Sequence, residues 1–468
     1  MKNLRQRIAI CAMLFVFLLQ AVALAASVNT KVNGIRFSSG AERYRIVFDV
    51  DKLPEYKVTV TNNGTRILLD FSNTDNKTEY TDLKVHDDTV QNVSFLKAAD
   101  KFRVEIQLSQ PAEYKVGTLK NPSRIFIDIQ KEYEKKTSEE IAPGLVHTTY
   151  VRRDGNGLLT AHLLDVDSSR YQLKPALSNG IIAGRETVSG ISDDNNALAA
   201  INASYFELDG SILGLTKIDG KIVSTTYLAR SAFGIMPDGK PVVGKVEYNG
   251  KVSSGKISVP VDGVNCERGE NNLILYNSYF DATTGTNAYG IEYIVKNGYV
   301  TAINTANSPI PADGIVVSAH GTAKDALANI KVGDKMTISQ DVGTPWNQAQ
   351  QVLGVGPMLL SNGQVHVTST EEQFGNDVAG GRAPRTAIGL LPNGHVLLAV
   401  VDGRQSSSAG CTLAEMGALM KSFGATDAVN FDGGGSSEMV IGGAVINSPS
   451  DGTERRIGSA LLVMKKAQ

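Results

Sequence analysis

The chain has 468 residues, of which 42% are hydrophobic and 20% charged, and its formal net charge is −2. This composition is typical of a globular protein with a large core, and it excludes low-complexity disorder and collagen-like repetition. The charge offers no basic footprint, so we expect no nucleic-acid partner. At about 100–200 residues per domain, the length predicts two to four domains. The 46 glycines, beside a single tryptophan, favour strands and turns over helix bundles.

Residues 1–26 are typical of a secretory signal peptide. A basic start (Lys2, Arg5 and Arg7) precedes an apolar run that ends in Ala23-Leu24-Ala25, a small-x-small cleavage pattern. An uncleaved anchor is the alternative, because the run is nearly long enough to span a bilayer. No other apolar run approaches this length, so no membrane span is expected after cleavage. The sequence therefore predicts a secreted or cell-envelope protein.

Two cysteines remain after cleavage, Cys266 and Cys411. Outside the cytosol they could pair as a disulfide, or they could be two buried free thiols. Without a Cys-x-x-Cys spacing, a structural zinc site is not expected. Residues 250–257 resemble a phosphate loop, but Ile257 stands where a Mg²⁺-binding hydroxyl is needed. We therefore interpret this stretch as a hairpin turn.

Residues 28–131 contain an internal repeat. Three blocks recur with one constant offset of 58 residues (for example 103 − 45): Arg45–Val50 with Arg103–Leu108, Glu55–Val58 with Glu113–Val116, and Arg66–Phe71 with Arg124–Ile129. A constant offset over three blocks indicates a duplicated unit. Each unit has too few short strands to bury both faces, so the two together predict a β-sandwich.

The arginine-led strands and the Arg-Ile-x-x-Asp pattern of this repeat resemble the AMIN domain of bacterial envelope proteins. The resemblance implies binding of cell-wall polysaccharide as a partner. An unrelated sandwich with a structural role is the alternative. The charged segment 132–143 has no apolar period and predicts a linker. A second domain then spans 144–468.

The second domain is expected to be an α+β domain with a mixed sheet. Short strands are predicted at 158–166, 389–401 and 459–464. One helix is predicted from Thr412 to Phe423, where Thr412 and Glu415 form a capping box and Gly424 ends the helix.

Two carboxylates of this domain follow apolar strands and precede glycines. Asp402 comes directly after Val396–Val401, and Asp432 precedes three glycines. Glycoside cleavage requires such a pair of carboxylates. The N–H groups of Gly433 and Gly434 can form an anion-binding nest, to which Ser436 adds a hydroxyl. A tight turn capped by Asp432 is the alternative.

Three arginines nearby, Arg382, Arg385 and Arg404, offer planar forks for phosphate oxygens. A structural ion pair with Asp402 or Asp432 is the alternative for each. His320 could lie near a site, although a lone histidine is more often structural. The six histidines show no close metal-ligand spacing. No cofactor is therefore expected, and a divalent cation held by the two carboxylates is left open.

Residues from about 144 to 466 resemble the phosphodiester glycosidase family. The resemblance is carried in chain order by Asn202–Phe206, Gly354–Pro357, Arg382–Gly389, Val401–Arg404, Asp432–Ser437 and Arg455–Leu461. In the first motif Ala203 and Ser204 stand where many relatives have glycines, which leaves the substrate detail in doubt.

The resemblance implies hydrolysis of the C1–O bond of a sugar-1-phosphodiester, similar to an N-acetylglucosamine-1-phosphodiester, in a phosphodiester-linked glycan. The products would be free sugar and a phosphomonoester. By this resemblance the catalytic residues are Asp402, Asp432 and Arg385, and the residues that bind phosphate and sugar are Arg404, Gly433, Gly434, Ser436, Asn202 and Tyr205. Two alternatives stay open: a non-catalytic envelope protein that binds glycan phosphates, and a phosphodiesterase that cuts the P–O bond.

Overall fold

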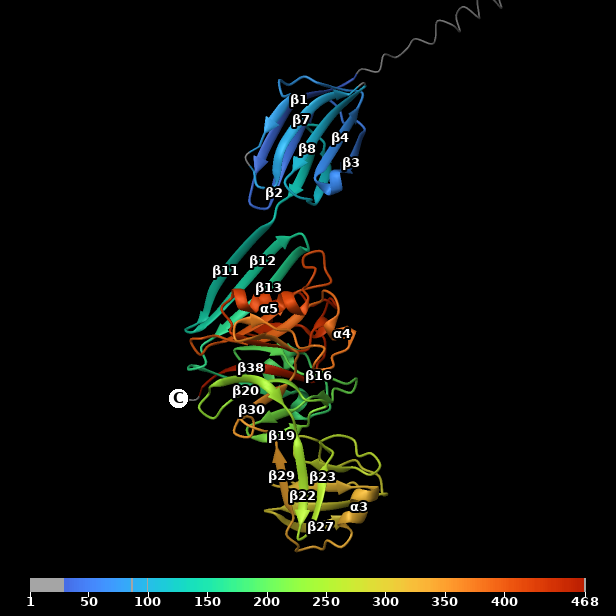
Figure 1. The fold of residues 1–468 in the computed structure, drawn as a ribbon, viewed down its shortest axis with the longest axis vertical. Helices are drawn as coiled ribbons and strands as arrows, with labels where there is room; N and C mark the ends of the chain where they lie inside the picture. The colour runs from blue at the N-terminus through green and yellow to red at the C-terminus, as the bar shows by residue number, and fades with distance from the viewer. Residues whose placement is uncertain (1–28, 86, 99, 467–468) are drawn as a thin grey trace, which may run out of the picture. The chain divides into compact units, whose positions relative to one another are not determined.

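The computed structural model describes residues 29–85, 87–98 and 100–466, and these divide into two compact units (Figure 1). The first unit ends at Tyr133 and also takes in residues 153–155, and the second comprises the remainder from Glu134 onward. The predicted signal peptide lies outside the described residues. Within the described part, no helix has both the length and the apolar character needed to cross a membrane.

The first unit consists of two five-stranded sheets around one core. One sheet has the order β5-β1-β2-β10-β9 and the other β3-β4-β8-β7-β6. Both sheets contribute fully buried side chains to the core, including Phe48 and Phe71. The strands are β1 (Thr30–Ser39), β2 (Arg43–Val50), β3 (Tyr56–Thr61), β4 (Arg66–Ser72), β5 (Thr74–Asn76), β6 (Asp82–Lys84), β7 (Val90–Ala98), β8 (Lys101–Leu108), β9 (Tyr114–Leu119) and β10 (Arg124–Gln130).

Strand pairing in this unit crosses between the two halves of the repeat. Strand β2 pairs with β10 so that Asp49 lies opposite Arg124, and β8 pairs with β4 so that Gln107 lies opposite Arg66. A shift of 58 residues converts one register into the other, because 49 + 58 = 107 and 66 + 58 = 124. Each half therefore completes a sheet with strands of the other half.

A pair of bidentate ion pairs follows the same relation. Arg45 donates to Asp128 at 2.5 and 2.6 Å, and Arg103 donates to Asp70 at 2.6 and 2.8 Å. Both carboxylates are buried, and Arg103 holds the pKa of Asp70 below its ordinary value against the opposing effect of burial. Loss of either arginine would leave a buried charge without its partner.

The largest sheet of the second unit has the order β11-β12-β13-β34-β33-β35-β31-β32. Figure 1 shows β11, β12 and β13 side by side next to helix α5. Its strands are β11 (Tyr133–Ala142), β12 (Leu145–Asp154), β13 (Gly157–Val166), β31 (Met358–Ser361), β32 (Gln364–Val365), β33 (Arg385–Leu390), β34 (Val396–Val401) and β35 (Asp427–Asn430).

The interval 132–143, for which the sequence predicts a linker, forms strand β11 instead. Nearly all side chains of β11 are exposed. An edge strand of this kind is held by its backbone hydrogen bonds, so no apolar period announces it in the sequence.

The remaining sheets of the second unit are smaller. A five-stranded sheet contains β14 (Tyr171–Leu177), β38 (Ser459–Lys465), β15 (Ala199–Asn202), β36 (Met439–Ile441) and β37 (Ala444–Val445). Another contains β19 (Lys221–Ser224), β18 (Thr216–Ile218), β30 (Gln351–Gly354), β20 (Arg230–Ile235) and β21 (Pro241–Val246), and β16 (Tyr205–Phe206) pairs with β17 (Ile212–Leu213).

Two further sheets lie in the chain between β21 and β30. The first contains β22 (Asn249–Ser254), β23 (Ile257–Val261) and β29 (Thr337–Asp341), and the second contains β24 (Gly263–Val264), β25 (Leu273–Tyr276), β26 (Ile291–Lys296), β27 (Tyr299–Asn304) and β28 (Ile315–Ala319). The hairpin expected at 250–257 is confirmed, because β22 and β23 pair antiparallel and place Ser254 opposite Ile257.

The described part of the second unit has four short α-helices, α2 (Val188–Asp194), α3 (Gly321–Leu327), α4 (Asn376–Ala379) and α5 (Leu413–Ser422). The predicted helix is confirmed as α5: Thr412 is its N-cap, the capping box with Glu415 is complete, and Gly424 follows at φ +91°. The expected α+β domain is instead mostly strand. Only the α5 segment carries a helical apolar period, whereas most other segments are short strands ended by glycines.

Two predicted strands need different comments. The strand expected at 459–464 is present as β38. The strand expected at 389–401 is wrong, because the chain reverses between Leu390 and Val396, and β33 and β34 form a hairpin. Asn393 and Gly394 in this turn are the signal that the continuous apolar run concealed.

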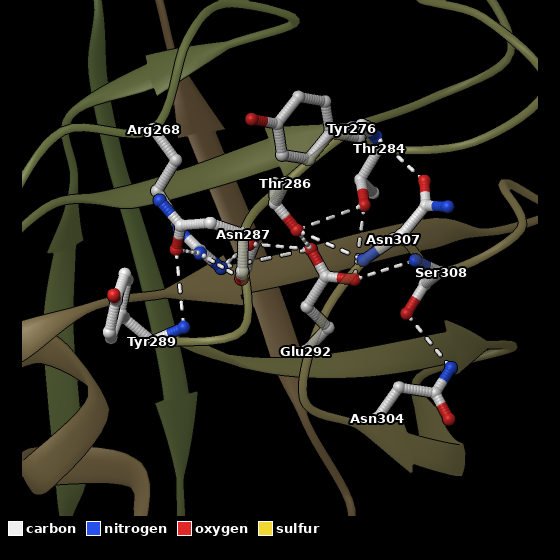
Figure 2. Close-up of polar contacts among 12 residues, drawn as sticks. Arg268, Tyr276, Thr284, Thr286, Asn287, Tyr289, Glu292, Asn304, Asn307 and Ser308 are labelled. Carbon is white, nitrogen blue, oxygen red and sulfur yellow. Dashed lines mark hydrogen bonds and ion pairs between the residues drawn. The ribbon is translucent and has the colours of Figure 1, made fainter.

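A buried ion pair organises the sheet that contains β25, β26 and β28 (Figure 2). Glu292 is fully buried and accepts hydrogen bonds from Thr284, Thr286, Ser308 and Ser318. Burial opposes its ionisation, but these donors hold its pKa below the ordinary value. Arg268 lies 3.8 Å away and donates to Ser318 and Asn287. We interpret this saturated network as structural, since Glu292 has no oxygen left for chemistry.

Candidate active site

The candidate site lies where three segments meet at one edge of the eight-stranded sheet. Strand β33 begins at Arg385, and its antiparallel neighbours β34 and β35 end there, with Val401 opposite Arg385 and Asn430 opposite Ala387. The turns that follow β34 and β35 therefore emerge on both sides of the start of β33. This topology brings together motifs that are separated by nearly 50 residues in the sequence.

Glycines allow both turns to press against Pro384. A Cβ atom on Gly403 would lie 2.6 Å from Pro384 N, which no side chain tolerates. Gly434 donates its N–H to Pro384 O at 2.9 Å and has φ +62°, a conformation that favours glycine. The carbonyl and nitrogen of one proline thus set the spacing between the two turns.

Asp432 is partly exposed at this edge. Its Oδ1 accepts a hydrogen bond from Gly433 N at 2.9 Å. Burial raises the pKa of Asp432 to about 6, although Ser436, Gly433 and Arg455 favour the charged form. The Ser436 hydroxyl acts here by proximity, because its geometry falls short of a formed hydrogen bond. The group can therefore gain or lose a proton in mildly acidic water.

Asp402 is more deeply buried, at 5% exposure. Its Oδ1 accepts from Ser448 N at 2.9 Å and from Asn447 Nδ2 at 3.2 Å, and its Oδ2 lies 4.0 Å from His162 Nε2. Burial raises its pKa above the ordinary value. The recorded partners of Asp402 and Asp432 are all different. The structure thus brings the two predicted carboxylates to one edge, with a separate environment for each.

The three candidate arginines differ sharply. Arg385 is 2% exposed and donates to three carbonyls, those of Cys411, Val378 and Gly381. Burial lowers its pKa, and among the described residues it has no carboxylate partner. The alternative of an ion pair with Asp402 or Asp432 is therefore excluded for Arg385.

Arg404 is exposed, and its guanidinium lies beside Gly434. Within the described part of the chain it makes no hydrogen bond and no ion pair. Its φ of +60° is unusual for a side chain of this size and directs the residue out of the turn. Arg382, in contrast, forms an ion pair with Glu415 at 2.7 Å and so belongs to the start of α5.

The anion-binding nest expected at Gly433 and Gly434 is a correction. Gly433 N is taken by Asp432, and Gly434 N is taken by Pro384 O. The residues Gly434–Ser436 form a short 3₁₀ turn that uses these donors internally. The remaining donors at this edge are the Arg404 guanidinium and the serine hydroxyls.

Asn202 and Tyr205, expected to contact a sugar, are instead engaged with the protein. Asn202 is 1% exposed; it accepts from Thr386 Oγ1 at 2.7 Å and donates to Asp432 O at 2.7 Å. Tyr205 donates to Gly356 O at 2.9 Å, and burial raises its pKa far above the ordinary value. Their observed role is to hold the backbone of the Asp432 turn.

The sequence-based predictions missed a group of buried polar atoms around this turn. Each lacks a hydrogen-bond partner: Ser204 Oγ, Asn430 Oδ1, Ser436 Oγ, Ser437 Oγ and Glu438 Oε1. Native proteins leave few such atoms, and those that remain commonly mark a binding or catalytic role. The adjacent Ser-Ser-Glu stretch is a signal in the sequence, but its burial could not be inferred from it.

Glu438 was also missed. It is 1% exposed, and burial together with its neighbour Glu454 raises its pKa to about 9. Glu454 accepts from Ser189 N and Ser189 Oγ, and its pKa is lowered. The two carboxyls therefore share one proton, which Glu438 carries at neutral pH.

Cysteine, histidine and metal predictions can now be assessed. Cys266 and Cys411 are free thiols, and only Cys411 is buried, where its pKa rises to about 12. His320 is the N-cap of α3 beside Tyr289, in the sheets between β21 and β30. In the described ranges, no group of three or more His, Cys, Asp or Glu is arranged to hold a metal ion.

Residues 289–464 match the phosphodiester glycosidase family, so this segment carries a domain of that family. Asp402, Asp432, Arg385 and Arg404 lie within the matched segment, whereas Asn202 and Tyr205 precede it. The class that fold and site define is thus a hydrolase-related domain with its two carboxylates inside the family match.

Particular relatives support this assignment. The N-acetylglucosamine-1-phosphodiester alpha-N-acetylglucosaminidase of Mus musculus is 26% identical over 173 residues, 34% of this chain and 33% of that protein. The SPbeta prophage-derived uncharacterized protein YomE of Bacillus subtilis is 41% identical over 80 residues, 17% of this chain and 12% of that protein. The chain thus spans a third or less of these relatives.

A crystal structure of a hypothetical protein from Synechocystis has the same fold. It aligns with a TM-score of 0.64 at 20% identity and covers 94% of this chain and 81% of its own.

Proposed function

We propose that this chain is an exported cell-envelope hydrolase that cleaves the glycosidic C1–O bond of a sugar-1-phosphodiester similar to an N-acetylglucosamine-1-phosphodiester. The products are free sugar and a phosphomonoester. One observation carries the proposal: the unpaired guanidinium of Arg404 lies beside Gly434, in the turn that begins with Asp432. A cation for the phosphate and a carboxylate for the sugar thus belong to adjacent parts of one edge.

Each group has a defined part in this reaction. Arg404 binds the phosphate oxygens and stabilises the charge that develops as the bond breaks. Phosphate is a fair leaving group, so the demand for a strong general acid is small. Asp432 stabilises the oxocarbenium-like sugar or activates water, and Asp402 is the second carboxylate. Asn202 and Tyr205 act as positioning residues for the Asp432 turn.

Arg385 contributes through its field. Its guanidinium is buried on carbonyl oxygens alone, so no carboxylate cancels its charge. A buried, uncancelled cation attracts an anion more strongly than an exposed cation does, because the local dielectric is low. This favours an anionic substrate over a neutral glycoside.

The first unit supplies the second half of the proposal. We infer that it is an AMIN-like duplicated domain that binds cell-wall polysaccharide. The matching registers of β2 with β10 and of β8 with β4 support the duplication. The predicted signal peptide at 1–26 supports export. Together these features would hold the hydrolase near a phosphodiester-linked glycan.

A chromogenic sugar-1-phosphodiester, followed by product analysis, tests the proposal. Free sugar and phosphomonoester are expected. In Arg404→Met the KM is expected to rise about tenfold with a smaller change in kcat, and Arg404→Lys should recover part of the loss, because lysine keeps the charge without the fork. Arg36→Met, in the first unit, is the matched control.

Other outcomes would refute parts of the proposal. Sugar-1-phosphate with free alcohol would show cleavage of the P–O bond. Binding of the substrate without turnover would show a non-catalytic glycan-binding protein. An unchanged KM in Arg404→Met would remove this arginine from the phosphate site.

A further inference from the structure

We propose that His147 and His162 form a proton relay that connects Asp402 with the protein surface. The proposal rests on the assignment of Asp402 as a reacting carboxylate in the function above. The Asp402 Oδ2 atom lies 4.0 Å from His162 Nε2. The other ring nitrogen, His162 Nδ1, is 3.2 Å from His147 Nε2. Finally, His147 Nδ1 is 3.6 Å from Glu139 Oε1.

The sheet order explains why these groups form a line. Glu139, His147 and His162 come from β11, β12 and β13, and Asp402 follows β34 directly. These four strands are consecutive neighbours in the sheet, so the line crosses it from its edge toward the candidate site. Figure 1 shows the first three strands side by side.

Burial gives the line two different ends. The His147 and His162 residues are 6% and 8% exposed and Asp402 is 5% exposed, whereas the Glu139 side chain is 71% exposed. A proton on Asp402 therefore has a buried path of two rings to a carboxylate in water. The two imidazole planes lie within 5° of parallel, with 5.5 Å between their centroids.

Proton transfer along the line balances without any further reactant. Asp402 takes a proton from water that attacks C1 and passes it to His162 Nε2. His162 then releases its Nδ1 proton to His147 Nε2, and His147 releases its Nδ1 proton to Glu139, which exchanges with solvent. Each ring gains one proton and loses one, and the carboxylate of Asp402 is restored for the next turnover.

A purely electrostatic role for His162 fits the geometry less well. The groups that face the two rings from neighbouring strands are Glu139 and Asp402. An ion pair with Asp402 would need a charged His162, but burial and the adjacent His147 lower the pKa of His162 to about 4. Near neutral pH a neutral ring faces Asp402, and a neutral imidazole with two opposed partners can both accept and donate.

The relay is tested by the dependence of kcat on pH in His162→Gln, His147→Gln and Glu139→Gln, with Asp402→Asn as the reference. Glutamine keeps a polar side chain but cannot pass a proton between two nitrogens. We expect kcat to fall about tenfold in both histidine variants with KM unchanged, and the pH at half-maximal kcat to shift. Added imidazole should restore part of the rate. His395→Gln, whose ring contacts Asp165, is the control.

The outcomes separate the relay from the proposed function. If Asp402→Asn retains full turnover, the role of Asp402 in the proposed function fails first. If Asp402→Asn loses turnover while folded His147→Gln keeps the wild-type profile, the relay is wrong. Glu139→Gln carries the test if the buried variants do not fold, because its side chain is exposed, and an unchanged profile there also overturns the relay.

Discussion

Replacement of Asp432 by asparagine is expected to stabilise the protein while it abolishes turnover. Burial raises the pKa of Asp432 from 3.8 to about 6. Each tenfold change in proton affinity is worth about 1.4 kcal/mol, so the ionised carboxylate costs the native state at most about 3 kcal/mol. Asparagine keeps a similar shape without the charge and avoids this cost.

The sign of the effect depends on pH. The folded pKa lies above the unfolded value, so the native state binds the extra proton between about pH 4 and 6. The stability that comes with this proton is complete below about pH 4 and is lost as the pH rises through 6. Asp432→Asn should therefore match the wild type at pH 4 and exceed it by up to about 3 kcal/mol at pH 8.

Urea unfolding followed by the fluorescence of Trp346 measures this difference. Trp346 is the single tryptophan, is 3% exposed and belongs to the same compact unit as Asp432. Asp325→Asn, at an exposed position of α3, is the control and should show no such pH dependence. Turnover in Asp432→Asn should fall at least about a hundredfold. Equal destabilisation at pH 4 and pH 8 would refute the assignment of Asp432 as a buried, strained carboxylate.

Two further predictions concern Glu438 and the first unit. Burial and Glu454 raise the pKa of Glu438 to about 9, so its contribution to stability is complete below about pH 4.5 and is lost as the pH rises toward 9. Glu438→Gln should gain in Tm over the wild type as the pH rises from 5 to 9, and a constant difference would contradict the shared proton. Removal of residues 28–131 should abolish co-sedimentation with cell-wall polysaccharide but preserve turnover of a small soluble substrate; retained co-sedimentation would place polysaccharide binding in the second unit.

Local signals in the sequence were sufficient for α5 and for the β22–β23 hairpin. The capping box at Thr412 and the terminal Gly424 act within a few residues of the helix, so neighbours in sequence carry all the information. Strand β11 had no such signal, because its side chains are exposed and its stability comes from a neighbouring strand. The β33–β34 turn was concealed by apolar residues on both sides of it.

The site was predictable in its members but not in their contacts. Asp402 and Asp432 each follow an apolar strand, and that pattern survives in the fold. Their partners come from distant segments, and Asn447, His162 and Pro384 enter only through the sheet order. The failed prediction of an anion nest has the same origin, since a distant carbonyl oxygen takes the Gly434 N–H.

The charges of this edge are arranged for an anion that is not yet bound. Burial raises the pKa of Asp402, Asp432 and Glu438, so each acid resists ionisation. Arg385 and Arg404 have no carboxylate partner in the described chain. Ionised acids would repel a phosphodiester and would also cancel these two cations. Acids that stay protonated longer leave the cations uncancelled, and a bound phosphate would then raise the same pKa values further. Substrate binding and proton uptake are therefore coupled in the same direction at this edge.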